Sequence, residues 1–221
     1  MCLQNITARR QHLHRMMDRP RLVIFCKAPI PGDVKSRLIA SFGIEGAAKI
    51  HEDLAARLIV QCLQSGLADT IDIELWCSPA TDHDFYHQFD ISRFLQQGDD
   101  LGERMLNAFM YAKTVTVLIG TDCPNLSTDY LRRSFDLLSS HDAVLGPAED
   151  GGYGLIGLQR AEADVFNDIN WGTEDVCSDT CRHFNTLGMN WALMPLLWDV
   201  DRPEDVDRWR SFISVSDQSD S

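Results

Sequence analysis

Short apolar runs alternate with longer segments of helical period along this chain. Branched and aromatic residues are concentrated in the short runs, which predict strands over 21–25, 71–77, 115–120, 142–147, 153–158 and 191–198. Between these runs, apolar residues recur every three or four positions, which predicts helices over 45–66, 101–113, 127–139, 173–187 and 203–213. This alternation predicts an α/β fold, a three-layer α/β/α sandwich around a mostly parallel central sheet.

The alternating pattern also indicates how the chain is organised. It continues without a break from 21 to 213, which predicts a single domain, as the length of 221 residues suggests. Residues 1–20 contain several arginines but no apolar core of a signal peptide, so we expect a flexible leader, with Met16 and Met17 as alternative translation starts. The polar residues 214–221 are expected to form a disordered tail. No run approaches the roughly twenty apolar residues of a membrane span.

Charge and cysteine content narrow the class of protein. The formal net charge of -13 argues against a nucleic-acid or anionic-membrane partner, so any bound anion requires a local basic cluster. Seven scattered cysteines without a CxxC pair indicate neither a disulfide framework nor a zinc ribbon, and they favour a cytoplasmic location. Cys177, Cys181 and His183 leave a soft-metal site open, although buried thiols are the favoured interpretation.

Charged and glycine-rich segments follow four of the predicted strands. In parallel α/β sheets, ligands bind outside the carboxyl ends of the strands, at the point where the strand order reverses. The segments "KAPIPGDVKSR", "TDCPNL", "AEDGGY" and "DVDRPED" occupy such strand ends. Four of them together favour a binding site at that edge of the sheet.

The first of these segments is a basic loop. The loop contains one glycine, Gly32, so it matches neither the Walker A motif of P-loop proteins nor the GxGxxG motif of dinucleotide-binding proteins. Lys27, Lys35 and Arg37 nevertheless present three cations before a helix, an arrangement that suits a phosphate-bearing ligand. The alternative is a solvated basic turn.

Two further strand ends carry carboxylates. Asp122 ends a buried strand, and Asp199 and Asp201 are two apart on an extended segment, so they face the same way. If Asp201 meets Asp122 across the sheet, the two would supply hard oxygen ligands for Mg²⁺ or Mn²⁺ bridging a diphosphate. The alternative for a lone aspartate is a turn or a helix cap.

The segment "GPAEDGGYGLIG" combines acids with two adjacent glycines. Paired glycines indicate a place where something approaches the backbone too closely for a side chain, or else an ordinary turn. Asp150 is then either a turn residue or a carboxylate directed into the cleft, as a base or a hydroxyl ligand.

Six blocks in the same order resemble a known family. The blocks "KAPIPGDVKSRL", "GDDLGERM", "GTDCPNL", "GPAEDGGYGLIGL", "WGTEDV" and "DVDRPEDV" are similar to bacterial glycosyltransferase-A-like (GT-A) nucleotide-diphospho-sugar transferases, some linked to arsenosugar biosynthesis. The resemblance covers nearly all of 21–210. "KSRL" and "DVDRPEDV" are also similar to nucleotidyltransferases, such as guanylyltransferases acting on phospholactate or the molybdenum cofactor.

The resemblance implies a role for each matching residue. Its nucleotide-binding residues would be Lys27, Ala28, Pro29, Gly32, Lys35, Arg37, Gln97 and Arg104. The sugar or acceptor would contact Gly151, Gly152, Tyr153, Trp171, Gly172 and Thr173. Asp122 and Asp201 would bind the metal, and Asp150, Lys35 and Arg37 would be catalytic.

The chain departs from the family pattern at three points. Asp33 stands where a neutral or basic residue is expected, and Arg202 stands where a threonine is usual. Where many GT-A enzymes have a DxD, this chain has one acid, Asp122.

The resulting expectation is a glycosyltransferase that uses a UDP- or GDP-linked sugar, a small acceptor and Mg²⁺ or Mn²⁺. Lys27, Lys35 and Arg37 would neutralise the leaving diphosphate, and Asp150 would take a proton from the acceptor. One alternative is nucleotidyl transfer with release of pyrophosphate. A second is a non-catalytic nucleotide-sugar-binding protein.

Overall fold

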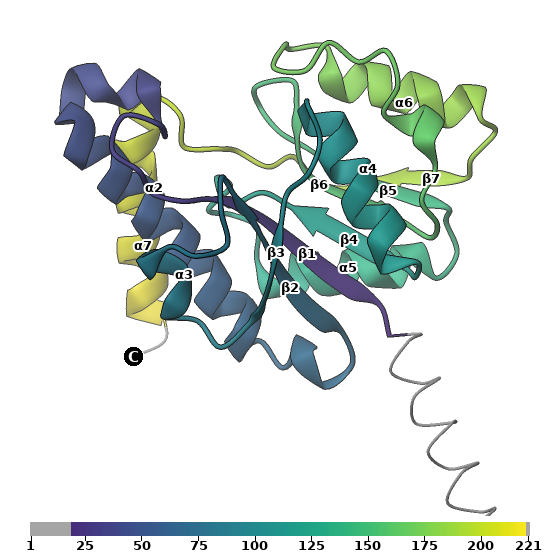
Figure 1. The fold of residues 1–221 in the computed structure, drawn as a ribbon, viewed down its shortest axis with the longest axis horizontal. Helices are drawn as coiled ribbons and strands as arrows, with labels where there is room; N and C mark the ends of the chain where they lie inside the picture. Colours follow the sequence, from purple (N-terminus) through teal and green to yellow (C-terminus); the bar gives the residue numbers. More distant parts are fainter. Residues whose placement is uncertain (1–18, 220–221) are drawn as a thin grey trace, which may run out of the picture.

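A seven-stranded sheet forms the centre of the computed structural model, which describes residues 19–219 (Figure 1). Its strand order is β3-β2-β1-β4-β6-β5-β7, and only β6 runs antiparallel to its neighbours. The mostly parallel α/β sheet that the sequence predicts is therefore confirmed. The strands are β1 (Arg21–Lys27), β2 (Asp72–Ser78), β3 (Ser92–Leu95), β4 (Thr116–Ile119), β5 (Ala143–Pro147), β6 (Tyr153–Leu158) and β7 (Trp191–Leu193).

Helices connect these strands and cover both faces of the sheet. They are α2 (Ile39–Gln64), α3 (Asp84–His87), α4 (Leu101–Ala112), α5 (Thr128–Leu138), α6 (Val176–Thr186) and α7 (Pro203–Ser219), with 3₁₀ turns at Ser36–Leu38, Leu67–Asp69 and Ala163–Val165. Side chains cap several of them: Ser127 accepts a hydrogen bond from the Tyr130 amide at 3.2 Å, and Asp100 accepts one from the Glu103 amide at 2.8 Å.

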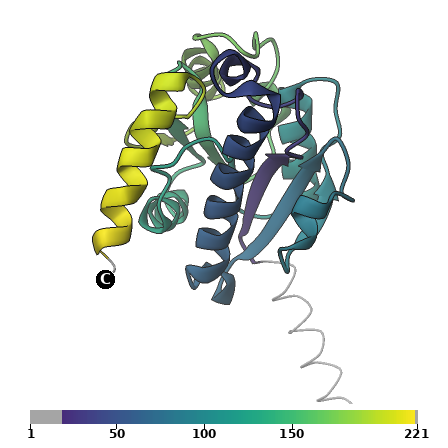
Figure 2. The same cartoon turned by 90° about the vertical axis from the view of Figure 1, so that its left-hand side faces the viewer.

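The alternation of side chains along the strands divides the core between the two faces. From β1, Leu22 and Ile24 pack with α2 and α5, whereas Val23 and Phe25 pack with α4 and α6. A third apolar cluster joins the first half of α2 to α7, and includes Trp198 and Trp209 (Figure 2). The first two clusters, one on each face of the sheet, hold the helices against it and give the three layers that the sequence predicts.

The strand order determines where a binding site is expected, at the carboxyl ends of the central strands β1 and β4. Strand β1 has β2 on one side and β4 on the other, so the direction of winding reverses between β1 and β4. The loops after these two strands therefore lie side by side. Because β6 is antiparallel, the residues that precede it lie at this same edge.

Several boundaries differ from the sequence prediction. Strand β3 is missing from it, because β3 is short and largely exposed at the edge of the sheet. The predicted strand over 191–198 is shorter, since Pro195 follows β7, and Leu197 forms only an isolated bridge with Ala148. Helix α2 begins earlier and has a kink at Gly43, where φ is 71°.

The ends of the chain also differ in part from the prediction. Residues 1–18 of the expected leader, with Met16 and Met17, lie outside the described residues, as do 220 and 221 of the expected tail. Arg19 is held by hydrogen bonds to the carbonyls of Ala68 at 2.6 Å and Ile71 at 3.1 Å. Helix α7 continues to Ser219, within the expected tail. Over the described range, none of the helices has the length and apolar character needed to cross a bilayer.

Candidate functional site

Two cavities meet at the central edge of the sheet. The first, which we call the basic lobe, has a volume of about 480 Å³ and is lined by Lys27, Lys35 and Arg37 among others. The second, the acidic lobe, has a volume of about 670 Å³ and is lined by Asp150, Asp199 and their neighbours. Arg37, Leu101, Gly120 and Asp122 line both cavities, so the two lobes form one continuous site.

Lys35 and Asp122 form the contact at the junction of the lobes. The Lys35 ammonium lies 2.7 Å from Asp122 Oδ1 and donates a hydrogen bond of 2.6 Å to the Val200 carbonyl. Lys35 has a left-handed backbone, with φ of 50°, and its side chain is only 5% exposed. Asp122 Oδ1 is buried, yet 47% of the Asp122 side chain is exposed. Its other carboxylate oxygen is therefore the one that remains accessible to a ligand.

His51 supports the same carboxylate from helix α2. Its Nε2 lies 3.0 Å from the Lys27 carbonyl, and its Nδ1 lies 3.8 Å from Asp122 Oδ1. Burial alone favours the neutral form of Asp122, but the Lys35 ammonium and the His51 ring outweigh burial and hold the pKa of Asp122 well below its usual range. Asp122 is thus a permanent negative charge between the ends of β1 and β4.

Replacement of His51 tests this support. We expect His51→Leu to lower the free energy of unfolding by about 1–3 kcal/mol, because the part-buried Lys27 carbonyl loses its imidazole partner and keeps the Cys26 thiol, 3.3 Å away. Urea unfolding measures the change. His87→Leu, at an exposed ring that contacts Asp82, is the control, and we expect a change within about 0.5 kcal/mol. Equal stabilities of the two variants would show that the His51 hydrogen bond does not stabilise the fold and that the ring only fills space beside α2.

Arg37 joins the basic loop to the segment after β7. Its guanidinium forms an ion pair with Asp201, and this contact raises the pKa of Arg37 further. The Val200 amide donates to the Asp122 carbonyl at 3.0 Å, so the chain around Asp201 is fixed against the end of β4. Asp201 therefore lines the basic lobe together with Asp122, and a guanidinium contacts its carboxylate.

Asp199 and Asp150 bring two negative charges together in the acidic lobe. Burial and the nearby Asp150 carboxylate raise the pKa of Asp199 to about 6. Asp150 Oδ1 also accepts a hydrogen bond from the Gly152 amide at 2.9 Å. Asp150 thus has both roles that the sequence leaves open: it closes a turn and faces the cleft.

Cys123 lies beside these acids, but it is a poor nucleophile. Burial and the carboxylates of Asp122, Asp199 and Asp150 raise the pKa of the Cys123 thiol well above its usual range. A thiolate is the reactive form of cysteine, and this environment disfavours it. The surroundings of Cys123 therefore do not favour a nucleophilic role for its thiol.

The first of the paired glycines, Gly151, is explained by a close contact within the protein. A Cβ at Gly151, where φ is +88°, would lie 2.2 Å from the Glu174 carbonyl oxygen. The Gly151 carbonyl accepts a hydrogen bond of 2.9 Å from the Cys177 amide. The close approach that the sequence predicts is thus made by the start of α6. The turn at Gly151 and the segment 170–176 form one wall of the acidic lobe.

Aromatic rings complete that wall. The ring of Trp171 lies against Gly102, where an added Cβ would be 2.6 Å from it, and it contacts Tyr153 edge to face at 6.5 Å. The Tyr153 hydroxyl points toward Met105, 3.9 Å away, and burial raises the pKa of Tyr153. Trp171 and the ring of Tyr153 therefore offer apolar surface to the cavity, while the Tyr153 hydroxyl lies among core residues.

The structure brings together many, but not all, of the residues expected from the sequence. Those that line the two lobes are Lys27, Lys35, Arg37, Asp122, Asp150, Gly152, Tyr153, Trp171, Gly172, Thr173 and Asp201. Ala28 lines a smaller cavity beside the basic lobe. Pro29, Gly32, Gln97, Arg104 and Gly151 shape the surrounding loops: Arg104 donates to the Gly98 carbonyl at 3.0 Å, and the Gln97 carbonyl accepts from Asn107 at 2.9 Å.

Several lining residues were not assigned a role from the sequence. Among them are His51, Gln96 and Asp199. His51 has a signal in the sequence, because it is a polar residue on an otherwise apolar helix face. Asp199 is two residues from Asp201 on an extended segment, so the sequence indicates that it faces the same way. Gln96 follows β3, the strand that the sequence pattern does not reveal.

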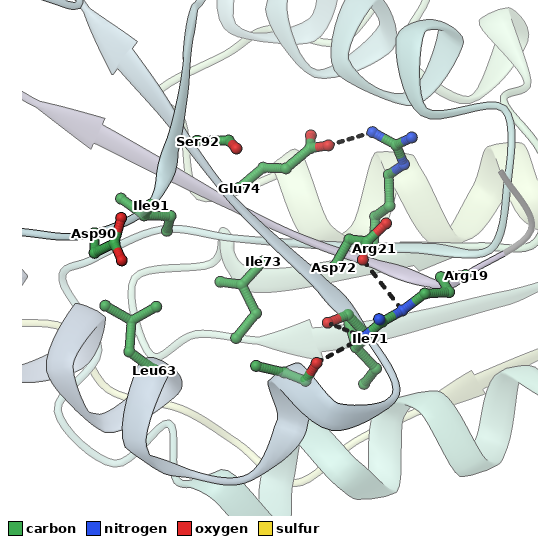
Figure 3. Close-up of a pocket in the computed structure, with 11 residues that line it drawn as sticks. Arg19, Arg21, Leu63, Ile71, Asp72, Ile73, Glu74, Asp90, Ile91 and Ser92 are labelled. Carbon is green, nitrogen blue, oxygen red and sulfur yellow. Dashed lines mark hydrogen bonds and ion pairs between the residues drawn. The ribbon is translucent and has the colours of Figure 1, made fainter. Parts of the chain in front are cut away.

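Another cavity lies at the opposite edge of the sheet, where β1 and β2 begin (Figure 3). Its volume is about 580 Å³, and its two arginines are ion-paired: Arg19 lies 3.1 Å from Asp72, and Arg21 forms an ion pair with Glu74. Glu74 also accepts a hydrogen bond of 3.1 Å from the Trp76 indole. This cavity lies where the strands begin, whereas ligands of such sheets bind outside the carboxyl ends of the strands, so it is the weaker candidate.

Residues 19–219 contain no group of three or more His, Cys, Asp or Glu side chains placed to hold a metal ion, and this includes Cys177, Cys181 and His183. The six cysteines in this range are free thiols.

Comparisons with known proteins point in the same direction as the geometry. The family described as "uncharacterized protein conserved in bacteria (DUF2064)" matches residues 60–173. No curated protein matches the chain significantly. A solved structure from Desulfovibrio desulfuricans G20, provisionally named a nucleotide-diphospho-sugar transferase, is 33% identical, with a TM-score of 0.72 over 84% of this chain and 83% of that chain. The resemblance indicated by the six sequence blocks is therefore confirmed.

Two more distant structures share the fold. CMP:2-keto-3-deoxy-manno-octonic acid synthetase complexed with CTP is 8% identical, with a TM-score of 0.61 over 90% of this chain and all (100%) of that chain. A cytidylyltransferase from Leptospira borgpetersenii is 13% identical, with a TM-score of 0.52 over 80% of this chain and 76% of that chain. Structural neighbours of the chain thus include proteins named for nucleotide-sugar transfer and for nucleotidyl transfer.

Proposed function

The chain belongs to the DUF2064 family of bacterial proteins, and from this premise and the site geometry we propose that it is a glycosyltransferase with a nucleoside-diphosphate sugar as donor. The nucleotide would occupy the basic lobe, and the sugar and its acceptor would occupy the acidic lobe. The diphosphate would then lie at the junction, between Arg37 and Asp122, where the lobes meet.

The observation that carries this proposal is the gathering of three cations in one lobe, whereas carboxylates outnumber cations in the other. Lys27, Lys35 and Arg37 suit an anionic nucleotide, whereas Asp150 and Asp199 line the cavity for the second substrate. The raised pKa of Asp199, about 6, already reflects burial and repulsion by Asp150. A nucleotidyl transfer that begins with attack by a phosphate or carboxylate would bring another anion into this lobe. A neutral hydroxyl acceptor does not meet that repulsion.

Each residue has a distinct part in the proposed reaction. Arg37 would neutralise negative charge on the departing diphosphate, and Lys35 would hold Asp122 in place while contributing its own charge. Asp150 would accept the proton of the acceptor hydroxyl, because its carboxylate reaches the cleft from a fixed turn. Trp171 and Tyr153 would pack against a sugar ring and exclude water.

A divalent ion fits the donor set at the junction. Mg²⁺ is often held by one or two carboxylates together with substrate phosphates, so the lack of a three-residue cluster in the described chain does not conflict with it. Asp122, with its accessible oxygen, would be one ligand, and Asp199 or Asp201 would be the second. Of these two, Asp199 carries no guanidinium, unlike Asp201. When bound, Mg²⁺ or Mn²⁺ would supply positive charge for the leaving diphosphate.

Product analysis tests the proposal. The protein is incubated with Mg²⁺ or Mn²⁺ and either UDP- and GDP-sugars or nucleoside triphosphates, and free nucleoside diphosphate and pyrophosphate are measured separately. We expect nucleoside diphosphate from the sugar donors. Pyrophosphate from triphosphates would instead establish nucleotidyl transfer. Nucleotide-dependent thermal stabilisation without either product would indicate a binding protein.

A further inference from the structure

Asp33 and Lys27 carry opposite charges and line the same two cavities, but they do not form an ion pair with each other. Both line the basic lobe and a smaller adjoining cavity, yet across residues 19–219 neither side chain has an ion pair or a hydrogen bond. The backbone around them is fixed, because the Asp33 amide donates to the Ile30 carbonyl at 3.0 Å and the Lys27 carbonyl contacts His51. A hydrogen-bond acceptor and a donor thus stand ready at the outer end of the basic lobe.

The adjoining cavity has the size and surface expected for a flat ring. Its volume is about 170 Å³, which is smaller than the about 300–1,000 Å³ of pockets that hold a whole drug-sized ligand. Ala28, Ile30, Val34 and Pro79 give it apolar walls. Apolar walls with a few polar groups at the edge are typical of sites that bind a heterocycle.

A carboxylate in this position is unsuited to the phosphate end of a nucleotide. Two anions repel each other, and Asp33 has no cation paired with it, whereas the carboxylates of Asp122 and Asp201 at the junction of the lobes are paired with Lys35 and Arg37. Asp33 is not among the residues that line the acidic lobe. The part of a nucleotide that complements Asp33 is therefore one that donates hydrogen bonds.

We propose that Asp33 and Lys27 recognise a guanine base, so that the donor is a guanosine-diphosphate sugar; this inference rests on the function proposed above. The two carboxylate oxygens of Asp33 accept hydrogen bonds from N1–H and the 2-amino group of guanine, and the Lys27 ammonium donates to O6. Uracil offers one N–H on this edge, and adenine and cytosine each offer one amino group. Guanine alone presents two adjacent donors beside an acceptor.

Nucleotide titrations test the assignment. Isothermal titration calorimetry of the wild-type chain with GDP, UDP, CDP and ADP is expected to show GDP binding about tenfold to a hundredfold more tightly than the others. Asp33→Asn is expected to lose this preference and to bind xanthosine diphosphate better than GDP. The asparagine amide donates to the 2-oxo group of xanthine and still accepts from N1–H. The variant should therefore gain affinity for xanthosine diphosphate, a result that misfolding of the variant could not produce.

Asp69→Asn is the matched control, since Asp69 is an exposed acid at the opposite edge of the sheet. It should leave the GDP preference unchanged. Preference for another base, equal affinity for all four, or unchanged selectivity in Asp33→Asn would each overturn the guanine assignment while leaving nucleotide binding established. A uniform loss across all bases, matched by weak binding of 2′-deoxy-GDP, would assign Asp33 to the ribose instead. Absence of binding by all four nucleotides would overturn the proposed function itself.

Discussion

Asp122→Asn is expected to lower turnover by about a hundredfold or more while the chain stays folded. Asp122 lies where the lobes meet, with one oxygen 2.7 Å from the Lys35 ammonium and the other accessible from the cavity. Asparagine has the same shape but no charge, so it neither balances Lys35 nor binds a cation well. The measurement is kcat for release of nucleoside diphosphate from the sugar donor that the wild-type chain uses.

The effect on stability should be moderate. Breaking an ion pair costs about 0–1 kcal/mol when it is exposed and about 3–5 kcal/mol when it is buried. The Lys35–Asp122 pair lies between these cases, because only the Lys35 side chain is buried. Asp136→Asn, at an exposed position of α5, controls for loss of a negative charge. If Asp122→Asn turned over substrate as fast as Asp136→Asn, Asp122 would have no part in catalysis.

The sheet could be predicted from the sequence because its strands are buried on both faces. Runs such as 21–25 and 153–158 are continuous and apolar, as expected where helices cover the sheet on each side. Strand β3 gives no such signal, since three of its four residues are exposed. Pairing with β2, which no local pattern reveals, is what makes Ser92–Leu95 a strand.

The site could be predicted in outline because strand ends converge. Lys35 and Asp122 follow β1 and β4, which are neighbours in the sheet, so the sequence indicates their proximity. The exact partners depend on tertiary structure. The sequence left open whether Asp201 meets Asp122. In the structure the Asp201 carboxylate forms an ion pair with Arg37, and Asp199 lies near Asp150.

The contact at Gly151 also could not be predicted in full from the sequence. The sequence indicates that something approaches Gly151 closely, but not that it is the backbone of Glu174, more than twenty residues further along the chain. Only the packing of the α6 start against the β5–β6 turn reveals this. A wall of the acidic lobe therefore depends on a position without a side chain.

Gly151→Ala is expected to impair the acidic lobe selectively. The new Cβ would lie 2.2 Å from the Glu174 carbonyl oxygen, so the segment 170–176 must move and Trp171 with it. The hydrogen bond from Cys177 to the Gly151 carbonyl would be lost or stretched. We expect turnover to fall strongly, while nucleotide binding in the basic lobe, measured by calorimetry, stays close to that of the wild type.

Gly188→Ala is the control that separates backbone strain from the steric clash with Glu174. Gly188 also has a positive φ, +65°, but nothing lies within 4 Å of the added Cβ. The left-handed backbone alone should therefore cost Gly188→Ala about 1–2 kcal/mol in the free energy of unfolding, and Gly151→Ala should lose more. Equal losses in the two variants, with turnover unchanged in both, would mean that the wall adapts without cost. A greater loss in Gly151→Ala, with turnover lowered and nucleotide affinity retained, would establish that the two lobes bind independently and that the wall serves the second substrate.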